Sequence, residues 1–209
     1  MKKFQFLPEN LKARFLGVIT PITDFFVKLG VNPNFFTTVG LIISLIASFY
    51  LAAGSLRLGG ALVLLGGIFD TFDGKVARAS NRVTKFGALY DSTLDRYSEV
   101  FVFFGLAYYF TQNELSVIGY NWESVILVAI CMAIGGSVMT SYVRARAEGL
   151  GLECKVGIMQ RAERVVYLGV GALIHEVTLL IAIVLIAILA NITAIHRLYH
   201  VWQSENKQN

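Results

Sequence analysis

Four aspartates lie within two apolar stretches of this 209-residue chain, at spacings that suit shared chemistry. Asp70 and Asp73 are three residues apart, and Asp91 and Asp95 are four residues apart. Each spacing places both carboxylates on one face of a helix. The polar, basic stretch 80–85 between the pairs predicts a turn, which would make the two helices antiparallel and bring their acidic faces together.

Four carboxylates in one pocket need a compensating cation, because neighbouring negative charges destabilise one another and burial adds to that cost. Oxygen ligands in this number suit magnesium, manganese or calcium better than zinc, since no Cys or His lies nearby. Two divalent ions would suit phosphoryl or phosphatidyl transfer, in which metals neutralise developing charge and orient the attack. The alternative is that the acids are helix-surface charges, paired with the nearby basic residues Lys75, Arg78, Arg82 and Lys85.

The pattern D-x2-D-G-x2-A-R-x8-G-x3-D-x3-D is filled without a gap, so eight fixed residues occupy 26 positions. The fixed residues are Asp70, Asp73, Gly74, Ala77, Arg78, Gly87, Asp91 and Asp95. This pattern resembles the signature of the CDP-alcohol phosphotransferases, also called CDP-alcohol phosphatidyltransferases. The resemblance covers nearly the whole chain and is strongest over residues 70–95.

The resemblance implies roles for the residues of the motif. The expected ligands of two Mg²⁺ (or Mn²⁺) ions are Asp70, Asp73, Asp91 and Asp95. Asp95 is expected chiefly to take the proton of the attacking hydroxyl, because an alcohol is a poor nucleophile until a base removes that proton. The residues alone leave open which of Asp91 and Asp95 is this base.

The CDP group is expected to lie beside the first half of the motif. Arg78 offers a planar charged fork for a phosphate. Asn34 and Thr37 belong to a P-N-x-x-T-x-x-G element over residues 33–40, which resembles the nucleotide-facing element of the family and is also typical of helix capping. The full set of expected CDP contacts is Asn34, Thr37, Asp70, Asp73, Gly74, Arg78 and Ser80.

The composition is that of an integral membrane protein. Hydrophobic residues make up 56% of the chain, charged residues 15%, and the mean hydropathy is +0.62. Spanning a bilayer takes roughly 20 apolar residues in a helix. The candidate stretches are 35–54, 59–79, 86–111, 123–147, 162–177 and 178–202. We therefore predict an all-α integral membrane protein with six transmembrane helices.

An amphipathic pattern over residues 9–29 predicts a helix that lies in the cytoplasmic interface or packs on the bundle. The expected organisation is an N-terminal interfacial helix over 1–30, a membrane domain over 31–203 and a C-terminal tail over 204–209. Of the 18 Lys and Arg residues, only Arg57 falls on the side of the spans opposite the acidic motif. This predicts a multi-pass protein of the cytoplasmic membrane, with both termini and the active site facing the cytoplasm.

The excess of basic residues on that side favours anionic lipid headgroups as partners. Nucleic acid is not expected, because the positive charges are distributed among membrane-flanking loops rather than along one basic face.

Arginines at the expected cytoplasmic helix ends suggest a phosphorylated acceptor. The stretch S-Y-V-R-A-R-A-E, residues 141–148, resembles a subset of the family, the phosphatidylinositol phosphate synthases, in which this segment helps bind a phosphorylated inositol. Those enzymes often carry Lys where this chain has Arg144, and they carry an arginine near the end of the last span, as Arg197 is here. The expected acceptor-phosphate ligands are Arg144, Arg146 and Arg197, whose alternative role is that of membrane-flanking positive charge.

The basic loop after this segment ends in R-x-E-R, at residues 161–164. These residues form either a structural ion-pair group or part of the acceptor entrance.

These patterns predict transfer of a phosphatidyl group from CDP-diacylglycerol to inositol phosphate, which forms phosphatidylinositol phosphate and releases CMP in phospholipid biosynthesis. The alternative acceptor is glycerol 3-phosphate, which would make the chain a phosphatidylglycerophosphate synthase. Outside these enzymes, an intramembrane acid cluster suggests a divalent cation transporter, but transport requires no Gly74 or Arg78 at these spacings. Homodimerisation is implied by the family resemblance alone.

Overall fold

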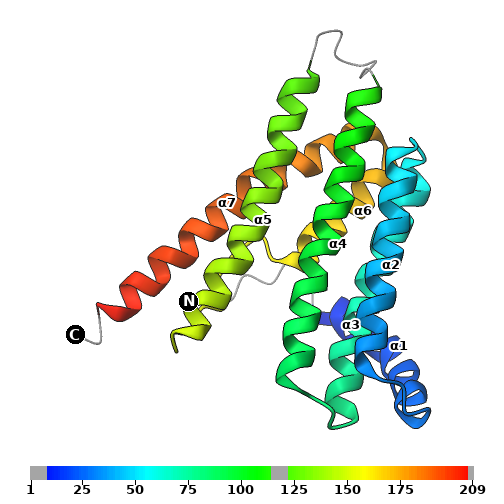
Figure 1. Ribbon diagram of the computed structural model, residues 1–209, viewed down its shortest axis with the longest axis vertical. Helices are drawn as coiled ribbons and strands as arrows, with labels where there is room; N and C mark the ends of the chain where they lie inside the picture. Colours follow the sequence, from blue (N-terminus) through cyan, green and yellow to red (C-terminus); the bar gives the residue numbers. More distant parts are fainter. Residues whose placement is uncertain (1–8, 114–121, 207–209) are drawn as a thin grey trace.

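The computed structural model of the chain describes residues 9–113 and 122–206, and every regular element within them is a helix. The helices are α1 (Glu9–Lys28), α2 (Pro33–Ala52), α3 (Leu56–Ala79), α4 (Lys85–Gln112), α5 (Glu123–Gly149), α6 (Arg161–Ile174) and α7 (Glu176–Glu205). Each follows an apolar stretch of the sequence, and Figure 1 shows their arrangement.

The predicted turn between the two halves of the acidic motif is confirmed. α3 ends at Ala79 and α4 begins at Lys85. Thr84 caps α4, because its side-chain oxygen accepts a hydrogen bond from the backbone N–H of Gly87 at 2.9 Å. Asn81 has a φ of 54°, a left-handed conformation that asparagine tolerates better than most residues and that reverses the chain here.

Within the described residues, three helices, α2, α5 and α7, are long and apolar enough to cross a membrane, so the chain is a membrane protein. α3 and α4 have 24 and 28 residues, and they carry the acidic residues of the motif. α6 has only 14 residues, or roughly 21 Å of helix at 1.5 Å per residue, which is shorter than a hydrocarbon core of about 30 Å. The count of six spans therefore stays a prediction.

The predicted break between the last two stretches is a true helix boundary. His175 has extended backbone angles, and its ring accepts a hydrogen bond from the backbone N–H of Val177 at 3.3 Å. The hydroxyl of Thr178 closes the same cap from the other side by contacting the His175 backbone N–H at 3.0 Å. α6 consequently ends at Ile174, three residues before the expected limit at 177.

The bundle is held together by close helix contacts. α2 packs against both α3 and α4, α6 packs against α3 and α7, and α5 packs against α7. Two glycines let helix backbones approach closely: a Cβ at Gly105 of α4 would lie 2.3 Å from the Ser48 carbonyl oxygen of α2, and a Cβ at Gly60 of α3 would lie 2.7 Å from the Gly169 carbonyl oxygen of α6. The apolar core between these helices includes Phe103, Leu106, Ile130 and Ile183, which are almost fully buried.

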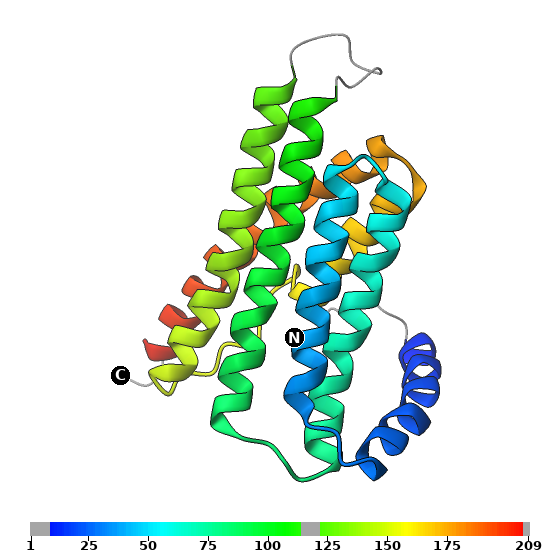
Figure 2. The ribbon, with the colours of Figure 1, turned by 45° about the vertical axis from the view of Figure 1, so that its right-hand side comes forward.

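α1 lies at the end of the molecule where α3 runs into α4, as both ribbon views show (Figure 2). The sequence correctly predicts a helix over this segment, and its position at a membrane interface stays a prediction. Phe26 of α1 packs edge-on against Phe36 of α2 and Phe72 of α3. Arg82 in the α3–α4 connection donates a hydrogen bond to the Gly30 carbonyl at 2.9 Å. These contacts fix the ends of the helices that carry the acidic motif.

Candidate active site

The four aspartates of the motif form one cluster. Asp70 and Asp73 lie near the C-terminal end of α3, and Asp91 and Asp95 lie in the first half of α4. Asp73 interacts with Asp91 side chain to side chain, and Asp70 interacts with Asp95 in the same way. One carboxylate oxygen from each of Asp70, Asp91 and Asp95 lies within 4.8 Å of the others. The residues that the spacing places on two helix faces therefore meet.

This cluster suits a hard divalent cation. Its donors are carboxylate oxygens, partly shielded from solvent, with no Cys or His among the grouped residues. Four ionised carboxylates would carry four negative charges, which two divalent ions would balance. The residues that would hold such ions are Asp70, Asp91 and Asp95, with Asp73 beside Asp91.

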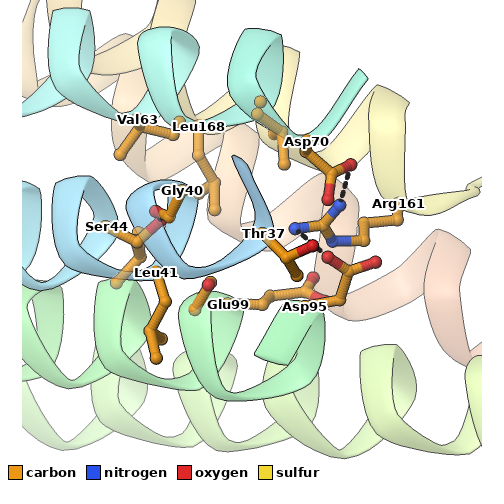
Figure 3. Close-up of a pocket in the computed structure, with 15 residues that line it drawn as sticks. Thr37, Gly40, Leu41, Ser44, Val63, Asp70, Asp95, Glu99, Arg161 and Leu168 are labelled. Carbon is orange, nitrogen blue, oxygen red and sulfur yellow. Dashed lines mark hydrogen bonds and ion pairs between the residues drawn. The ribbon is translucent and has the colours of Figure 1, made fainter. Parts of the chain in front are cut away.

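Arg161, the first residue of α6, reaches into the cluster. Its guanidinium lies between the carboxylates of Asp70 and Asp95 (Figure 3). It forms an ion pair with Asp70 through Nη1, and its Nη2 lies 3.0 Å from Oδ1 of Asp95. The sequence identifies Arg161 only as part of a basic loop, and its contact with the acidic motif across 91 residues has no local signal.

Thr37 on α2 contacts the cluster directly. Its hydroxyl donates a hydrogen bond to Oδ2 of Asp73 at 2.8 Å, and both side chains are buried. The other oxygen of Asp73 accepts a hydrogen bond from the backbone N–H of Gly74. Asp73 is therefore held in one orientation by two donors.

Asn34 lies one turn earlier on α2, beside the start of α4. A Cβ at Gly87 would lie 3.4 Å from Oδ1 of Asn34. The helix cap itself is Asn32, whose side chain accepts a hydrogen bond from the Asn34 backbone N–H at 3.0 Å. The Asn34 side chain thus takes no part in that cap, and it lies beside Gly87 of the second half of the motif.

Arg78 lies over Gly74, one helical turn away on α3. A Cβ at Gly74 would lie 3.2 Å from Nη1 of Arg78, so the glycine gives the guanidinium room to lie along the helix. Arg78 is exposed and forms no ion pair within the described part of the chain. The hydroxyl of Ser80, by contrast, donates to the Val76 carbonyl of its own helix at 2.7 Å. Arg78 is the more available of the two for an anionic ligand.

The sequence that forms this site matches a known protein family. The family model described as CDP-alcohol phosphatidyltransferase matches residues 30–202, which include every residue of the cluster. The chain belongs to the CDP-alcohol phosphatidyltransferase family. The expected family is therefore confirmed over nearly the whole chain.

Relatives of this phosphatidyltransferase family member include enzymes from archaea and bacteria. An archaetidylinositol phosphate synthase of Methanothermobacter thermautotrophicus is 38% identical over 189 residues, which cover 88% of this chain and 89% of the relative. A phosphatidylinositol phosphate synthase of Mycobacterium tuberculosis is 32% identical over 206 residues, which cover 95% of this chain and 92% of the relative.

Solved structures of the Mycobacterium tuberculosis phosphatidylinositol phosphate synthase share this fold. The structure with CDP-DAG bound has a TM-score of 0.75 and 29% identity, and the match covers 88% of this chain and 92% of that chain. The complex with manganese and citrate has a TM-score of 0.75 and 30% identity, and the match covers 88% of each chain.

Beside the acid cluster, the phosphatidyltransferase has a buried ion pair that agrees with the structural role expected for Arg164, although the sequence does not identify its partner. Arg164 on α6 contacts Glu99 on α4 through Nε at 2.5 Å and through Nη2 at 2.8 Å. Its Nη1 also donates to the Met159 carbonyl at 3.2 Å. The two side chains are 1% and 7% exposed, so this pair fixes α6 against α4 from inside the bundle.

The three arginines expected to bind the acceptor phosphate are placed differently from one another. Arg197 is buried, and it donates to the Val156 carbonyl through Nε at 2.7 Å and to the Thr140 carbonyl through Nη1 at 2.5 Å. Arg144 is half-exposed and pairs with Glu148, one turn further along α5, at 2.9 Å.

Arg144 on α5 and Arg197 on α7 lie close enough for their charges to interact, with Glu148 beside Arg144, and we call these two arginines the positive region. The structure therefore brings two of the three expected ligands, Arg144 and Arg197, near each other. Arg146 is exposed.

Proposed function

We propose that this phosphatidyltransferase moves a phosphatidyl group from CDP-diacylglycerol to inositol phosphate, forming phosphatidylinositol phosphate and releasing CMP. The observation that carries the proposal is the cluster of Asp70, Asp73, Asp91 and Asp95, built from the complete family motif. The alternative function, divalent cation transport through the acid cluster, gains no support from membership of a transferase family.

The relatives favour inositol phosphate as the acceptor. Their names differ in the lipid part, archaetidyl in one case and phosphatidyl in the other, but both name inositol phosphate. The positive region of Arg144 and Arg197 supports an acceptor that carries its own phosphate, because a guanidinium binds phosphate oxygens through charge-assisted hydrogen bonds. An uncharged acceptor would leave these charges without a ligand.

In the proposed reaction, an acceptor hydroxyl attacks the β-phosphorus of CDP-diacylglycerol. A new P–O bond forms to the acceptor, the P–O bond to CMP breaks, and the hydroxyl proton passes to Asp95. The family resemblance assigns this role to Asp95, whose carboxylate lies in the cluster beside Asp70 and Arg161. Arg78 and Thr37, from either side of Gly74 and Asp73, would orient the CDP phosphates.

Mg²⁺ or Mn²⁺ ions held by the acid cluster would supply charge stabilisation at the reacting phosphates. The manganese complex of the Mycobacterium tuberculosis enzyme supports the choice of a divalent cation. We propose two ions, since two divalent charges balance the four carboxylates of the motif.

We further propose that α2 to α7 form the membrane domain over residues 31–203, with six passages through the cytoplasmic membrane and with α1 in its cytoplasmic interface. The connection between α3 and α4, the C-terminal end of α5 and the C-terminal end of α7 lie towards the same end of the molecule in Figure 1, which supports a common cytoplasmic side. Family resemblance supports a homodimer.

The experiment that tests the function is CMP release by the purified chain with CDP-diacylglycerol and Mg²⁺. Inositol phosphate, glycerol 3-phosphate and free inositol serve as separate acceptors, and the lipid product is identified by mass spectrometry. We expect release that depends on inositol phosphate and stops when EDTA removes the metal. Dependence on glycerol 3-phosphate would keep the mechanism and replace the acceptor, whereas release with none of them would refute the proposal.

A further inference from the structure

Arg161 contacts two of the carboxylates that a metal ion would need. Its guanidinium contacts Asp70, and it lies 3.0 Å from Asp95. These two residues, with Asp91, are the ones whose carboxylate oxygens approach within 4.8 Å of one another. The positively charged side chain of Arg161 therefore already lies in the acid cluster.

A guanidinium and a divalent ion compete at such a place for electrostatic reasons. One arginine neutralises only one of the four carboxylates, so the cluster keeps an affinity for further positive charge. An ion at the same carboxylates would repel the guanidinium at a distance of a few ångströms, where Coulomb energies between partly buried charges are large. By thermodynamic linkage, the factor by which the bound guanidinium weakens metal binding is also the factor by which a bound metal ion weakens the contact of the guanidinium with these carboxylates.

The helix that carries Arg161 is anchored independently of the cluster. Arg164 lies one turn further along α6 and binds Glu99, which lies one turn beyond Asp95 on α4. This second pair is almost fully buried, whereas the Arg161 side chain is 24% exposed. The Arg161 side chain can thus leave Asp70 and Asp95 while α6 stays docked.

One donor of Arg161 is already unsatisfied in this position. Its Nε is buried and has no hydrogen-bond partner within the described residues. An unpaired buried donor weakens the bound arrangement, because its lost hydration is not replaced. The ion pairs with Asp70 and Asp95 must therefore offset the free-energy cost of burying the Arg161 side chain.

We propose that Arg161 is a built-in counter-cation of the metal-free site, which holds Asp70 and Asp95 together and is displaced from them when divalent ions bind. This inference rests on the proposed function, since it takes the acid cluster as the metal site. It assigns Arg161 two opposite effects: it stabilises the metal-free protein, and it weakens the apparent affinity for metal.

The test compares Mn²⁺ binding by the native chain and by Arg161→Gln, using the electron paramagnetic resonance signal of free Mn²⁺. Allosteric couplings commonly correspond to 5–150-fold changes in affinity, so we expect the variant to bind Mn²⁺ at least about fivefold more tightly. We also expect its metal-free form to unfold at a lower temperature and to gain more from added Mn²⁺ than the native chain does.

Two control variants separate competition from general structural damage. Arg161→Lys keeps a positive charge at the cluster, so its Mn²⁺ affinity should stay closer to that of the native chain than Arg161→Gln does. Arg164→Gln breaks the buried pair with Glu99, and it should lower the unfolding temperature without tightening Mn²⁺ binding.

Unchanged or weaker Mn²⁺ binding by Arg161→Gln would overturn the proposal, because Arg161 would then support the metal ligands rather than compete with the metal. Should that variant fail to fold, a structure of the native chain with Mn²⁺ decides: we expect Arg161 and Asp95 to have separated, and retention of the 3.0 Å contact would overturn the proposal. Tight Mn²⁺ binding without any CMP release would refute only the proposed function. No Mn²⁺ binding by the native chain would refute both.

Discussion

The acid cluster and the positive region carry opposite charges, and they are built in different ways. In the cluster, carboxylates from α3 and α4 face one another and share the guanidinium of Arg161. In the positive region, Arg197 donates to two backbone carbonyls, and Arg144 pairs with Glu148 of its own helix. Like charges are thus concentrated in the first region, whereas each arginine of the second already has partners of its own.

This difference indicates what each region can bind. Carboxylates that repel one another gain most from multivalent cations, and binding there should be strong and sensitive to every member. Arginines with partners of their own can add only part of their hydrogen-bonding capacity to a ligand. Arg197 has donors left over, because a guanidinium carries five N–H groups. We therefore expect large effects from changes in the acid cluster and graded effects from changes in the positive region.

The largest effect is expected from Asp95→Asn. The amide cannot accept the acceptor's proton, and general-base catalysis typically contributes about 10²–10⁴-fold, so kcat should fall by that order. CMP release under saturating CDP-diacylglycerol and inositol phosphate measures this loss. Glu123→Gln is the matched control, because it makes the same carboxylate-to-amide change at the exposed start of α5 and should leave kcat unchanged.

Asp95→Asn also removes the partner of Arg161, so Arg161→Gln must be measured beside it. If both variants lost activity equally, the ion pair rather than the base would explain the result. A native-like kcat in Asp95→Asn would instead assign the base to Asp91, which the sequence leaves open.

The next largest effect concerns the pair that supports the cluster. Glu99→Gln leaves Arg164 buried with an uncompensated charge, and breaking a buried pair in this way costs roughly 3–5 kcal/mol of folding stability. Thermal unfolding in detergent measures the change. Glu153→Gln, which removes the exposed pair with Lys155, should cost no more than about 1 kcal/mol. Equal effects of the two variants would contradict a supporting role for the Glu99–Arg164 pair.

Much of the acid cluster could be predicted because its determinants are local. Spacings of three and four residues fix a helix face, and a polar stretch of six residues predicts the turn that lets the two faces meet. The structure keeps these relations and adds α2, which packs against both motif helices and contributes the hydrogen bond from Thr37 to Asp73. The resemblance of residues 33–40 to a family element predicted a pocket role for Thr37, but not that contact.

The contacts of Arg161, Arg164 and Arg197 could not be predicted in the same way. Arg161 meets Asp70 across 91 residues, and Arg164 meets Glu99 across 65 residues, so neither pair has a sequence period to reveal it. Both depend on how far α6 slides along α3, which the close approach at Gly60 and Gly169 determines. The partners of Arg197 are backbone carbonyls, and every residue type carries one. Such acceptors give the sequence no signal.

In the positive region, Arg144→Gln should weaken binding of the acceptor, inositol phosphate, without affecting binding of CDP-diacylglycerol. A hydrogen bond to a charged group is worth about 1.5–3 kcal/mol, so a direct contact predicts a rise of at least about tenfold in KM for inositol phosphate. KM for CDP-diacylglycerol should not change. Arg57→Gln removes an exposed arginine at the start of α3, far from the acid cluster, and serves as the control. An unchanged KM for inositol phosphate would show that Arg144 does not bind the acceptor and would leave its alternative role as a membrane-flanking charge.

The smallest effect is expected from Glu148→Gln, and it has the opposite sign. The Arg144–Glu148 pair is 42% and 45% exposed, and an exposed pair four residues apart on a helix is worth about 0.3–0.5 kcal/mol. Releasing Arg144 from this pair should lower KM for inositol phosphate by a factor of about two, because RT is about 0.6 kcal/mol. The double variant Arg144→Gln/Glu148→Gln should match Arg144→Gln alone, since Glu148 acts only through its partner. A rise in KM in Glu148→Gln, or additive effects in the double variant, would show that the carboxylate touches the acceptor itself. The positive region would then bind its ligand through both charges of the ion pair, and its contrast with the acid cluster would disappear.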